Sequence, residues 1–278
     1  MNQELGKRRK ALRKRERFLG RVWRVGAQRR DLLLNLVSFG SLVGVWVVAS
    51  ALLSSTILPG PLETLAFTWR EFERGRLLFH MSITVQRVLI AFCVAMAIGT
   101  AAGVAMGASR WVDKLLNAWV VAGLTVPRIV LFVVAYLLLG LNDAAAVGAL
   151  ILTVLPTITV QIREGTKALD PKLLEMARAY RRSPLAIGRS VVLPQLLPYL
   201  LGTARGALSL AWKMVVLAEL LGRTSGVGYQ IAFYFQMFNM AGVLAYGLTM
   251  MVVLALIDTG FSAAAARTFR WRRPVQLT

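Results

Sequence analysis

Four ionisable side chains stand inside apolar stretches of this sequence, where each could act on a charged solute. They are Arg128, Arg205, Lys213 and Glu219. A charge at the centre of a lipid bilayer costs about 2.5–3.5 kcal/mol on insertion scales, so such residues by default mark a pathway. Three cations would suit an anionic solute. The alternative is that Arg205 or Lys213 pairs with Glu219 or extends to the membrane surface, although Lys213 and Glu219 are off the spacing for a pair within one helix.

Residues for catalysis or cofactor binding are scarce. The chain has one histidine, His80, for which we expect a structural or solvated role, and one cysteine, Cys93, which excludes a disulfide framework and reads as a small apolar residue. Gly165-Thr166-Lys167 lacks the earlier glycine and the following hydroxyl residue of a phosphate-binding loop. We therefore expect a chain that is not an enzyme and binds no cofactor or metal of its own.

Composition indicates an all-α, polytopic membrane helical bundle. Hydrophobic residues make up 57% of the 278 residues, and the mean hydropathy is +0.62. Apolar runs of about 20 residues are typical of membrane-spanning helices. About six transmembrane helices are predicted, at 32–57, 84–108, 116–140, 144–162, 192–221 and 241–263, within a transmembrane domain of 31–266. Pro127 is expected to kink the third helix.

Glycines recur at every fourth position in two of these helices. They are Gly99, Gly103 and Gly107 in the second helix, and Gly202 and Gly206 in the fifth. A row of glycines leaves a bare stripe on which another helix can approach closely. Both sets are predicted to pack against a neighbouring helix.

The net charge is +20, and the basic residues are distributed along the chain as the predicted topology requires. The basic segments are a tail at 1–30, 109–117, 163–190 and a tail at 267–278, and six spans place all of them on one side. The loops at 58–80, 141–143 and 222–240 are charge-balanced or nearly so. The positive-inside rule therefore predicts a multi-pass membrane protein with both termini in the cytoplasm, where the basic tails can contact anionic lipid. Nucleic acid is not an expected partner, because no recognition motif accompanies the charge.

The longest polar interruption, at 163–191, contains two predicted short helices. Asp170-Pro171 and Ser183-Pro184 are each typical of an N-cap followed by the first helical residue. On the first helix, Leu173, Ala177 and Tyr180 share a face, as do Leu174 and Ala177. A capped amphipathic helix pair needs a surface to receive it, either lipid headgroups or a partner protein.

This stretch resembles the cytoplasmic EAA loop of permease subunits of bacterial ABC importers. The family pattern is Glu-Ala-Ala, three residues, Gly, nine residues, Ile, one residue, Leu-Pro. Here it reads Glu175-Met176-Ala177, Arg181 in the glycine place, Val191 in the isoleucine place, and Leu193-Pro194. An arginine adopts positive φ only at a cost. Either Ser183-Pro184 forms the turn instead, or the loop geometry differs.

The resemblance implies a type I ABC importer transmembrane fold with cytoplasmic coupling helices. It also implies an inner-membrane permease that works with a separate ATPase subunit, which binds ATP and Mg, with a second permease subunit in a homodimer, and with an external substrate-binding protein. The residues that would contact the ATPase are Asp170, Pro171, Leu173, Leu174, Glu175, Ala177, Tyr180, Arg181, Ser183 and Pro184. Glu175 would make the polar contact, unless it only pairs with Arg178 or Arg182.

The stretch from Arg205 to Tyr229 resembles the sulfonate, nitrate and taurine branch of the family. The predicted cargo is thus a sulfonate, nitrate, taurine or a similar organic anion, and pyrimidine precursors, aromatic acids or other small solutes are alternatives within the same family. An ion-coupled secondary transporter or a channel acting without an ATPase is the alternative, since proline-broken helices suit it as well. It would give no reason for the capped helix pair. A membrane-embedded enzyme would need a catalytic cluster that the sequence lacks.

Overall fold

The computed structural model describes residues 33–54 and 57–268. The predicted basic tails lie outside these residues, except that the last helix runs on to Thr268. The chain divides into two compact units, residues 1–64 and 65–278. In the first unit, the apolar helix Leu33–Leu52 is long enough to cross a membrane. The indole N–H of Trp46 donates to the carbonyl oxygen of Pro59 over 3.1 Å, which holds the segment after the helix close to it.

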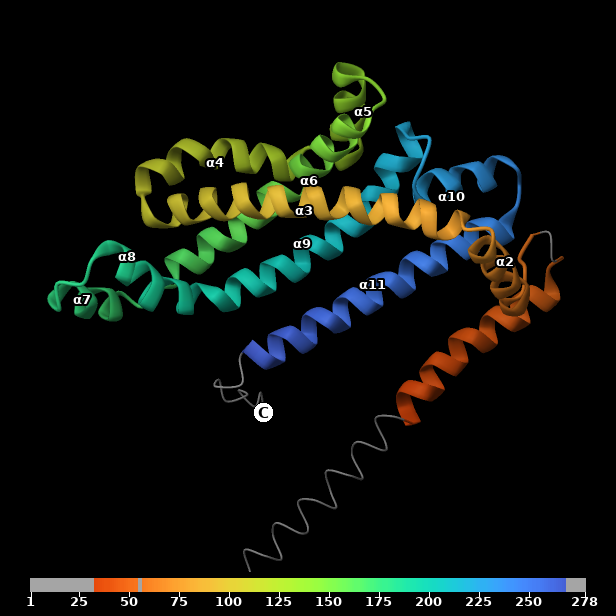
Figure 1. Cartoon of the computed structure of the whole chain (residues 1–278), viewed down its shortest axis with the longest axis horizontal. Coiled ribbons are helices and arrows are strands. Elements are labelled where there is room, and N and C mark those ends of the chain that lie inside the picture. Colours follow the sequence, from red (N-terminus) through yellow and green to blue (C-terminus); the bar gives the residue numbers. More distant parts are fainter. Residues whose placement is uncertain (1–32, 55–56, 269–278) are drawn as a thin grey trace, which may run out of the picture. The chain divides into compact units, whose positions relative to one another are not determined.

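The second unit is built from helices alone within its described residues (Figure 1). In chain order these are α2 Pro61–Glu73, which starts at the end of the first unit, α3 Arg76–Ala108, α4 Arg110–Thr125, α5 Arg128–Leu139, α6 Asp143–Lys167, α7 Pro171–Ala179, α8 Pro184–Ile187, the π-helical turn η1 Gly188–Val192, α9 Leu193–Gly222, α10 Val227–Gln236 and α11 Met240–Thr268. The short helices α7 and α8 lie at one end of this unit, and α10 lies toward the other end.

The segment predicted as a loop at 58–80 is largely helical, which corrects the sequence prediction. Helix α2 has Pro61 at its start and Glu63 in its first turn, both favourable there. Gly75, with φ of +72°, separates α2 from α3. Helix α3 therefore begins at Arg76 rather than near residue 84. The charged residues at 70–76, which suggested a loop, lie at the end of α2 and at the start of α3.

The predicted kink in the third span is a full break. Helices α4 and α5 meet at an angle of 99° around Val126-Pro127. Val126 has ψ of 128°, as expected for a residue before proline, and Pro127 has no N–H to continue the helix. Helix α4 also begins at Arg110, so the short basic segment predicted as a loop is part of the helix. Among the described residues, five helices could cross a membrane, or six if this bent pair counts as one span.

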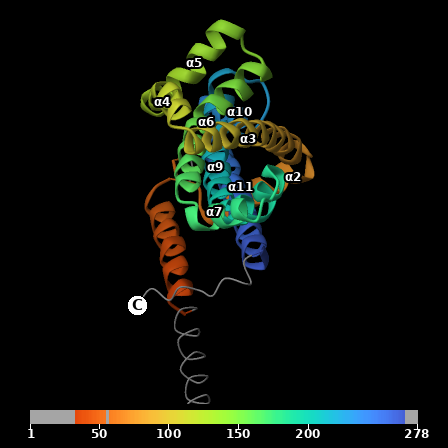
Figure 2. The same cartoon turned by 90° about the vertical axis from the view of Figure 1, so that its left-hand side faces the viewer.

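Helices α3, α6 and α9 pack against one another to form the core of the second unit (Figure 2). The glycine stripe of α3 lies against α6. A Cβ atom at Gly99 would lie 2.7 Å from Ile158 Cγ2, and one at Gly103 would lie 2.7 Å from the Thr159 carbonyl oxygen. Gly107 faces Thr166 in the same way. The bare backbone of α3 thus allows the close approach that the spacing predicts.

The second short helix of the polar stretch is continuous with the fifth span. Helix α8, the π turn η1 and α9 together form one helical segment, Pro184–Gly222. Residues Ile187, Val192 and Leu193 all keep right-handed helical dihedral angles across the junctions. The π turn lies just before Pro194, whose missing N–H interrupts regular helical hydrogen bonding. The prediction of two separate short helices is therefore right for α7 and wrong for the second, which is the start of the long one.

Candidate functional site

Helix α7 is closed at both ends by local hydrogen bonds. The Asp170 carboxylate accepts a hydrogen bond from the Lys172 N–H over 2.9 Å, and Pro171 is the first helical residue. At the other end, Arg181 has φ of +51°. Its N–H donates to the Arg178 carbonyl over 2.8 Å, and the next N–H donates to the Ala177 carbonyl over 3.2 Å. This pair of bonds is a Schellman motif with arginine where glycine is usual.

The turn between α7 and α8 therefore uses both devices that the sequence offered as alternatives. Arg181 takes the left-handed conformation itself. Ser183 then caps α8, since its hydroxyl oxygen accepts a hydrogen bond from the Ala186 N–H over 3.3 Å. The position that holds glycine in the EAA pattern thus has the left-handed backbone conformation here as well, and the arginine at this position is strained.

The apolar residues of α7 predicted to contact a partner differ in their exposure. Ala177 is only 6% exposed and Leu174 is half-buried, so both point toward the rest of this chain. Leu173 and Tyr180 are exposed, as is Glu175. Among the described residues Glu175 forms no ion pair with Arg178 or Arg182. Of the predicted set, only Leu174 and Ala177 are therefore withdrawn from the surface. The residues that stay open to a partner are Asp170, Pro171, Leu173, Glu175, Tyr180, Arg181, Ser183 and Pro184, together with Met176.

Gln195, which was not predicted as a site residue, links α7 to α9. The side-chain oxygen of Gln195 accepts a hydrogen bond from the Asp170 N–H over 2.9 Å. Its amide nitrogen donates to the Val191 carbonyl over 3.1 Å, in the π turn. A glutamine directly after the Leu-Pro pair has no local signal for this role, because its partner is 25 residues away.

The four charged residues predicted to line a pathway are not brought together. Arg128 begins α5 and is exposed in the single chain. Arg205 forms a bidentate ion pair with Asp258 of α11, over 2.5 and 2.6 Å. Lys213 is exposed on α9 and has no ion pair among the described residues. The alternative in which Glu219 pairs with Arg205 or Lys213 is therefore wrong.

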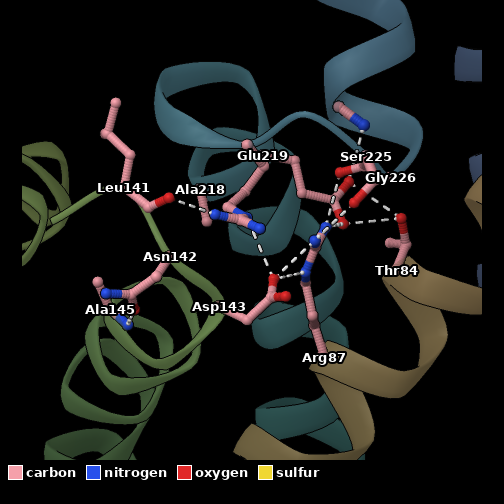
Figure 3. A network of polar contacts seen from close by, with 12 residues as sticks. Thr84, Arg87, Leu141, Asn142, Asp143, Ala145, Ala218, Glu219, Ser225 and Gly226 are labelled. Carbon is pink, nitrogen blue, oxygen red and sulfur yellow. Dashed lines mark hydrogen bonds and ion pairs between the residues drawn. The ribbon is translucent and has the colours of Figure 1, made fainter.

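Glu219 instead lies at the centre of a buried polar network, shown in Figure 3. Its side chain is fully buried, so it does not line an open path in this structure. Arg87 of α3 donates to its Oε1 over 2.7 Å, and the Thr84 hydroxyl lies 2.9 Å from both carboxylate oxygens. The Gly228 N–H donates to Oε2 over 2.8 Å. A buried carboxylate is stable only with such a set of donors.

Arg87 is the residue that links the network to other elements. Its Nε donates to Asp143 at the start of α6 over 2.9 Å. Its two terminal nitrogens donate to the carbonyl and hydroxyl oxygens of Ser225, over 2.7 and 3.0 Å. Arg223 approaches the same Asp143 oxygen at 3.1 Å. Arg87 was not among the residues predicted from the sequence, although a lone arginine near the start of an apolar stretch meets the criterion applied to Arg128.

The segment from Ser225 to Gly228, which leads into the first turn of α10, can reach Glu219 because two of its residues are glycines. Gly226 has φ of +107°, and a Cβ atom there would clash with the Glu219 carboxylate. A Cβ atom at Gly228 would lie 2.7 Å from Glu219 Cβ and would also contact the Val216 carbonyl oxygen. The glycine pattern within the branch-like stretch is therefore a packing requirement of this network.

Two more buried polar groups lie at the same end of the unit. His80 is 8% exposed and its Nδ1 accepts a hydrogen bond from the Gly226 N–H over 3.1 Å, a structural role as expected. Glu71 of α2 is 1% exposed and accepts hydrogen bonds from Arg76 over 2.6 Å and from the Tyr246 hydroxyl over 3.1 Å. These contacts join α2, α3, α10 and α11.

The remaining predictions concern small residues. A Cβ atom at Gly202 or Gly206 would meet nothing within 4 Å in the described part of the chain, so the predicted close packing of this second glycine pair does not occur within it. Cys93 is exposed on α3. No group of three or more His, Cys, Asp or Glu side chains that could hold a metal ion occurs among the residues described.

An apolar helical bundle with isolated charges and a capped polar loop is typical of a multi-pass membrane protein. The family model described as "Binding-protein-dependent transport system inner membrane component" matches residues 95–270. The chain belongs to this family. It is a transmembrane permease subunit of an ABC importer, a multi-pass inner-membrane component, as the EAA-like pattern predicted.

Relatives and solved structures agree with this assignment. The putative aliphatic sulfonates transport permease protein of Escherichia coli (strain K12) is 31% identical over 190 residues, 68% of this chain and 72% of that one. The nitrate import permease protein of Synechococcus elongatus is 25% identical, with 86% and 87% covered. The taurine transport system permease protein of Escherichia coli (strain K12) is 24% identical, with 89% and 92% covered.

The fold matches solved ABC importer subunits. The inward-facing MetNI methionine ABC transporter superposes with a TM-score of 0.60 at 22% identity, over 73% of this chain and 99% of that one. An amino acid ABC transporter with histidines superposes with a TM-score of 0.57 at 16% identity, over 72% and 95%. The fold is thus that of the type I ABC importer transmembrane subunit.

Proposed function

We propose that this permease moves a small anion, such as a sulfonate or nitrate, or a related solute such as taurine, inward across the bacterial inner membrane. The observation that carries this proposal is Lys213, a cation on the exposed face of α9 that has no ion pair among the described residues. A free ammonium group within a membrane helix is costly unless it faces water or a charged solute. The named cargoes of three relatives, aliphatic sulfonates, nitrate and taurine, fit such a residue.

The chain works with partners in this proposal. A second copy completes the pathway, and Gly202 and Gly206 of α9 leave an open face for close approach by that copy. A separate ATPase subunit binds ATP and Mg, contacts Leu173, Glu175 and Tyr180, and moves α7 together with α8 and α9. An external binding protein delivers the solute. Both termini and the end with α7 lie in the cytoplasm, in keeping with the basic excess at 163–190.

The cargo proposal is tested with the complete complex in proteoliposomes, by comparing uptake of the solute that its own binding protein holds. Lys213→Gln is expected to lower uptake of an anionic solute about tenfold, since a hydrogen bond to a charged group contributes about 1.5 kcal/mol. Lys213→Arg should retain most of it. Lys114→Gln, an exposed lysine on α4, is the matched control. Equal uptake by Lys213→Gln and the control would contradict the role of Lys213.

The same preparations test the docking surface separately. Glu175→Ala is expected to weaken association with the ATPase, measured by co-purification, without changing which solute is carried. Ala177→Glu is not a docking test, because Ala177 is buried against its own chain. Retention of the ATPase by Glu175→Ala with normal uptake would remove Glu175 from the contact.

A further inference from the structure

A cavity separates α7 and α8 from the ends of α3 and α6. Leu174 and Pro184 of the predicted ATPase contact line it, but Leu173, Glu175 and Tyr180 do not. Its volume is about 730 Å³. Most of the wall is apolar and comes from Val104, Leu169, Leu174, Ile187 and Val192. Gly107, Ala108, Gly188 and Thr166 complete it, together with Pro184 and two arginines, Arg178 and Arg182.

The two arginines are the only charged residues that line this cavity in the described part of the chain. The ion pairs nearby join Arg163 and Lys167 to Asp113, and Arg163 to Glu164. None of them involves Arg178 or Arg182, and Glu175 does not neutralise either one. Two guanidinium groups at an otherwise apolar hollow thus lack an anion among the described residues.

We propose that this cavity binds an anionic phospholipid, with the headgroup phosphate held by Arg178 and Arg182. Guanidinium groups bind phosphate through charge-assisted, often bidentate, hydrogen bonds. The apolar wall, formed partly by the ends of membrane helices, accommodates the glycerol and the upper acyl chain. Basic pockets between membrane helices on the cytoplasmic side are general sites for such lipids. This step rests on the proposed orientation, in which α7 lies in the cytoplasm.

Charge argues against other occupants. The terminal tails of this chain carry a large excess of arginine and lysine, so they would be repelled. The ATPase is expected on the opposite face of α7, where Leu173 and Tyr180 are exposed. The lipid would brace α7 against α3 and α6 from the membrane side while the ATPase contacts it from the cytoplasm.

The test is native mass spectrometry of the purified full-length chain in detergent, titrated with phosphatidylglycerol or with phosphatidylcholine of the same acyl composition. Wild type should retain phosphatidylglycerol in preference to phosphatidylcholine. Arg178→Gln with Arg182→Gln should weaken phosphatidylglycerol binding about 30-fold, and each single change about fivefold. Arg189→Gln, an exposed arginine of the same stretch that does not line the cavity, should leave binding unchanged.

A second variant separates loss of the site from loss of the fold. A Cβ atom at Gly188 meets nothing within 4 Å, so Gly188→Leu can fill the cavity without altering its charge. It should lower phosphatidylglycerol binding while the apparent melting temperature stays near that of wild type. Equal binding of both lipids, no effect of the double arginine variant, or displacement by millimolar inorganic phosphate alone would overturn the proposal. The proposal would also fail if the variant with both Arg178→Gln and Arg182→Gln no longer associated with the ATPase but still bound phosphatidylglycerol. None of these outcomes depends on which solute is carried.

Discussion

At the residue scale, single side chains in this permease take positions that their type does not favour. Arg181 adopts a left-handed conformation because the Schellman bonds at the end of α7 require one there. Glu219 can be fully buried because Thr84 and Arg87 of α3 and the Gly228 N–H of α10 supply donors to it. In both cases the surrounding hydrogen bonds, and not the preference of the residue type, determine where the residue lies.

Arg181→Gly is expected to stabilise the polar loop. Glycine takes φ near +51° without the steric cost that a side chain meets there, about 1 kcal/mol. The apparent melting temperature of the purified chain should rise, or α7 amides should exchange more slowly with deuterium. Arg182→Gly, the neighbouring position without positive φ, is the control and should not stabilise. A lower melting temperature for Arg181→Gly would mean that the guanidinium group contributes more than the strain costs.

At the element scale, the useful feature is one helical segment that runs from the loop into the membrane. Helix α8, η1 and α9 are continuous, and Gln195 joins α7 to this segment. We therefore expect a force applied to α7 to reach α9 through the hydrogen bond at Asp170 and through the short turn between α7 and α8. At its far end this helix carries Glu219.

Gln195→Leu is expected to reduce transport per ATP hydrolysed in the reconstituted complex about fivefold, because a net hydrogen bond of about 1 kcal/mol positions α7. Assembly with the ATPase should persist, since the exposed face of α7 is unchanged. Gln195→Glu keeps the acceptor oxygen for the Asp170 N–H and should retain most of the coupling. If Gln195→Leu transports as wild type does, the link between α7 and α9 lies elsewhere.

At the scale of the whole molecule, the second unit is held together differently at its two ends. The end with α10 is joined by the network of Arg87 and Glu219, which connects α3, α6, α9 and the loop before α10 (Figure 3). The end with α7 has a cavity and a hydrogen bond to the backbone of Asp170, and its ion pairs, of Arg163 and Lys167 with Asp113, are partly exposed. We expect the first end to resist separation of its helices more strongly.

Breaking the central ion pair should be severe. Arg87→Ala or Glu219→Ala is expected to cost about 3–5 kcal/mol of unfolding free energy, because each leaves a buried charge without its partner. The double variant should cost less than the sum, with a coupling of about 1–3 kcal/mol. Thermal unfolding in detergent measures both. The adjacent pair Arg163 and Glu164, which is partly exposed, is the matched control and should show little coupling. Additive single effects would place the stability of this end in the apolar core instead.

The sequence alone determined the class of protein and the architecture. Apolar length, the alternation of basic segments and the EAA-like spacing are local properties, so they can be read without coordinates. The same is true of the caps at Asp170 and Ser183 and of the close packing at Gly99, Gly103 and Gly107. Tertiary structure alone decided the rest. The partner of Glu219 is 132 residues away, and the partner of the Asp170 N–H is in another helix. Pro127 marks the break in the sequence, but its angle of 99° and the burial of Ala177 are set by the fold, because most contacts between distant segments leave no pattern in the sequence nearby.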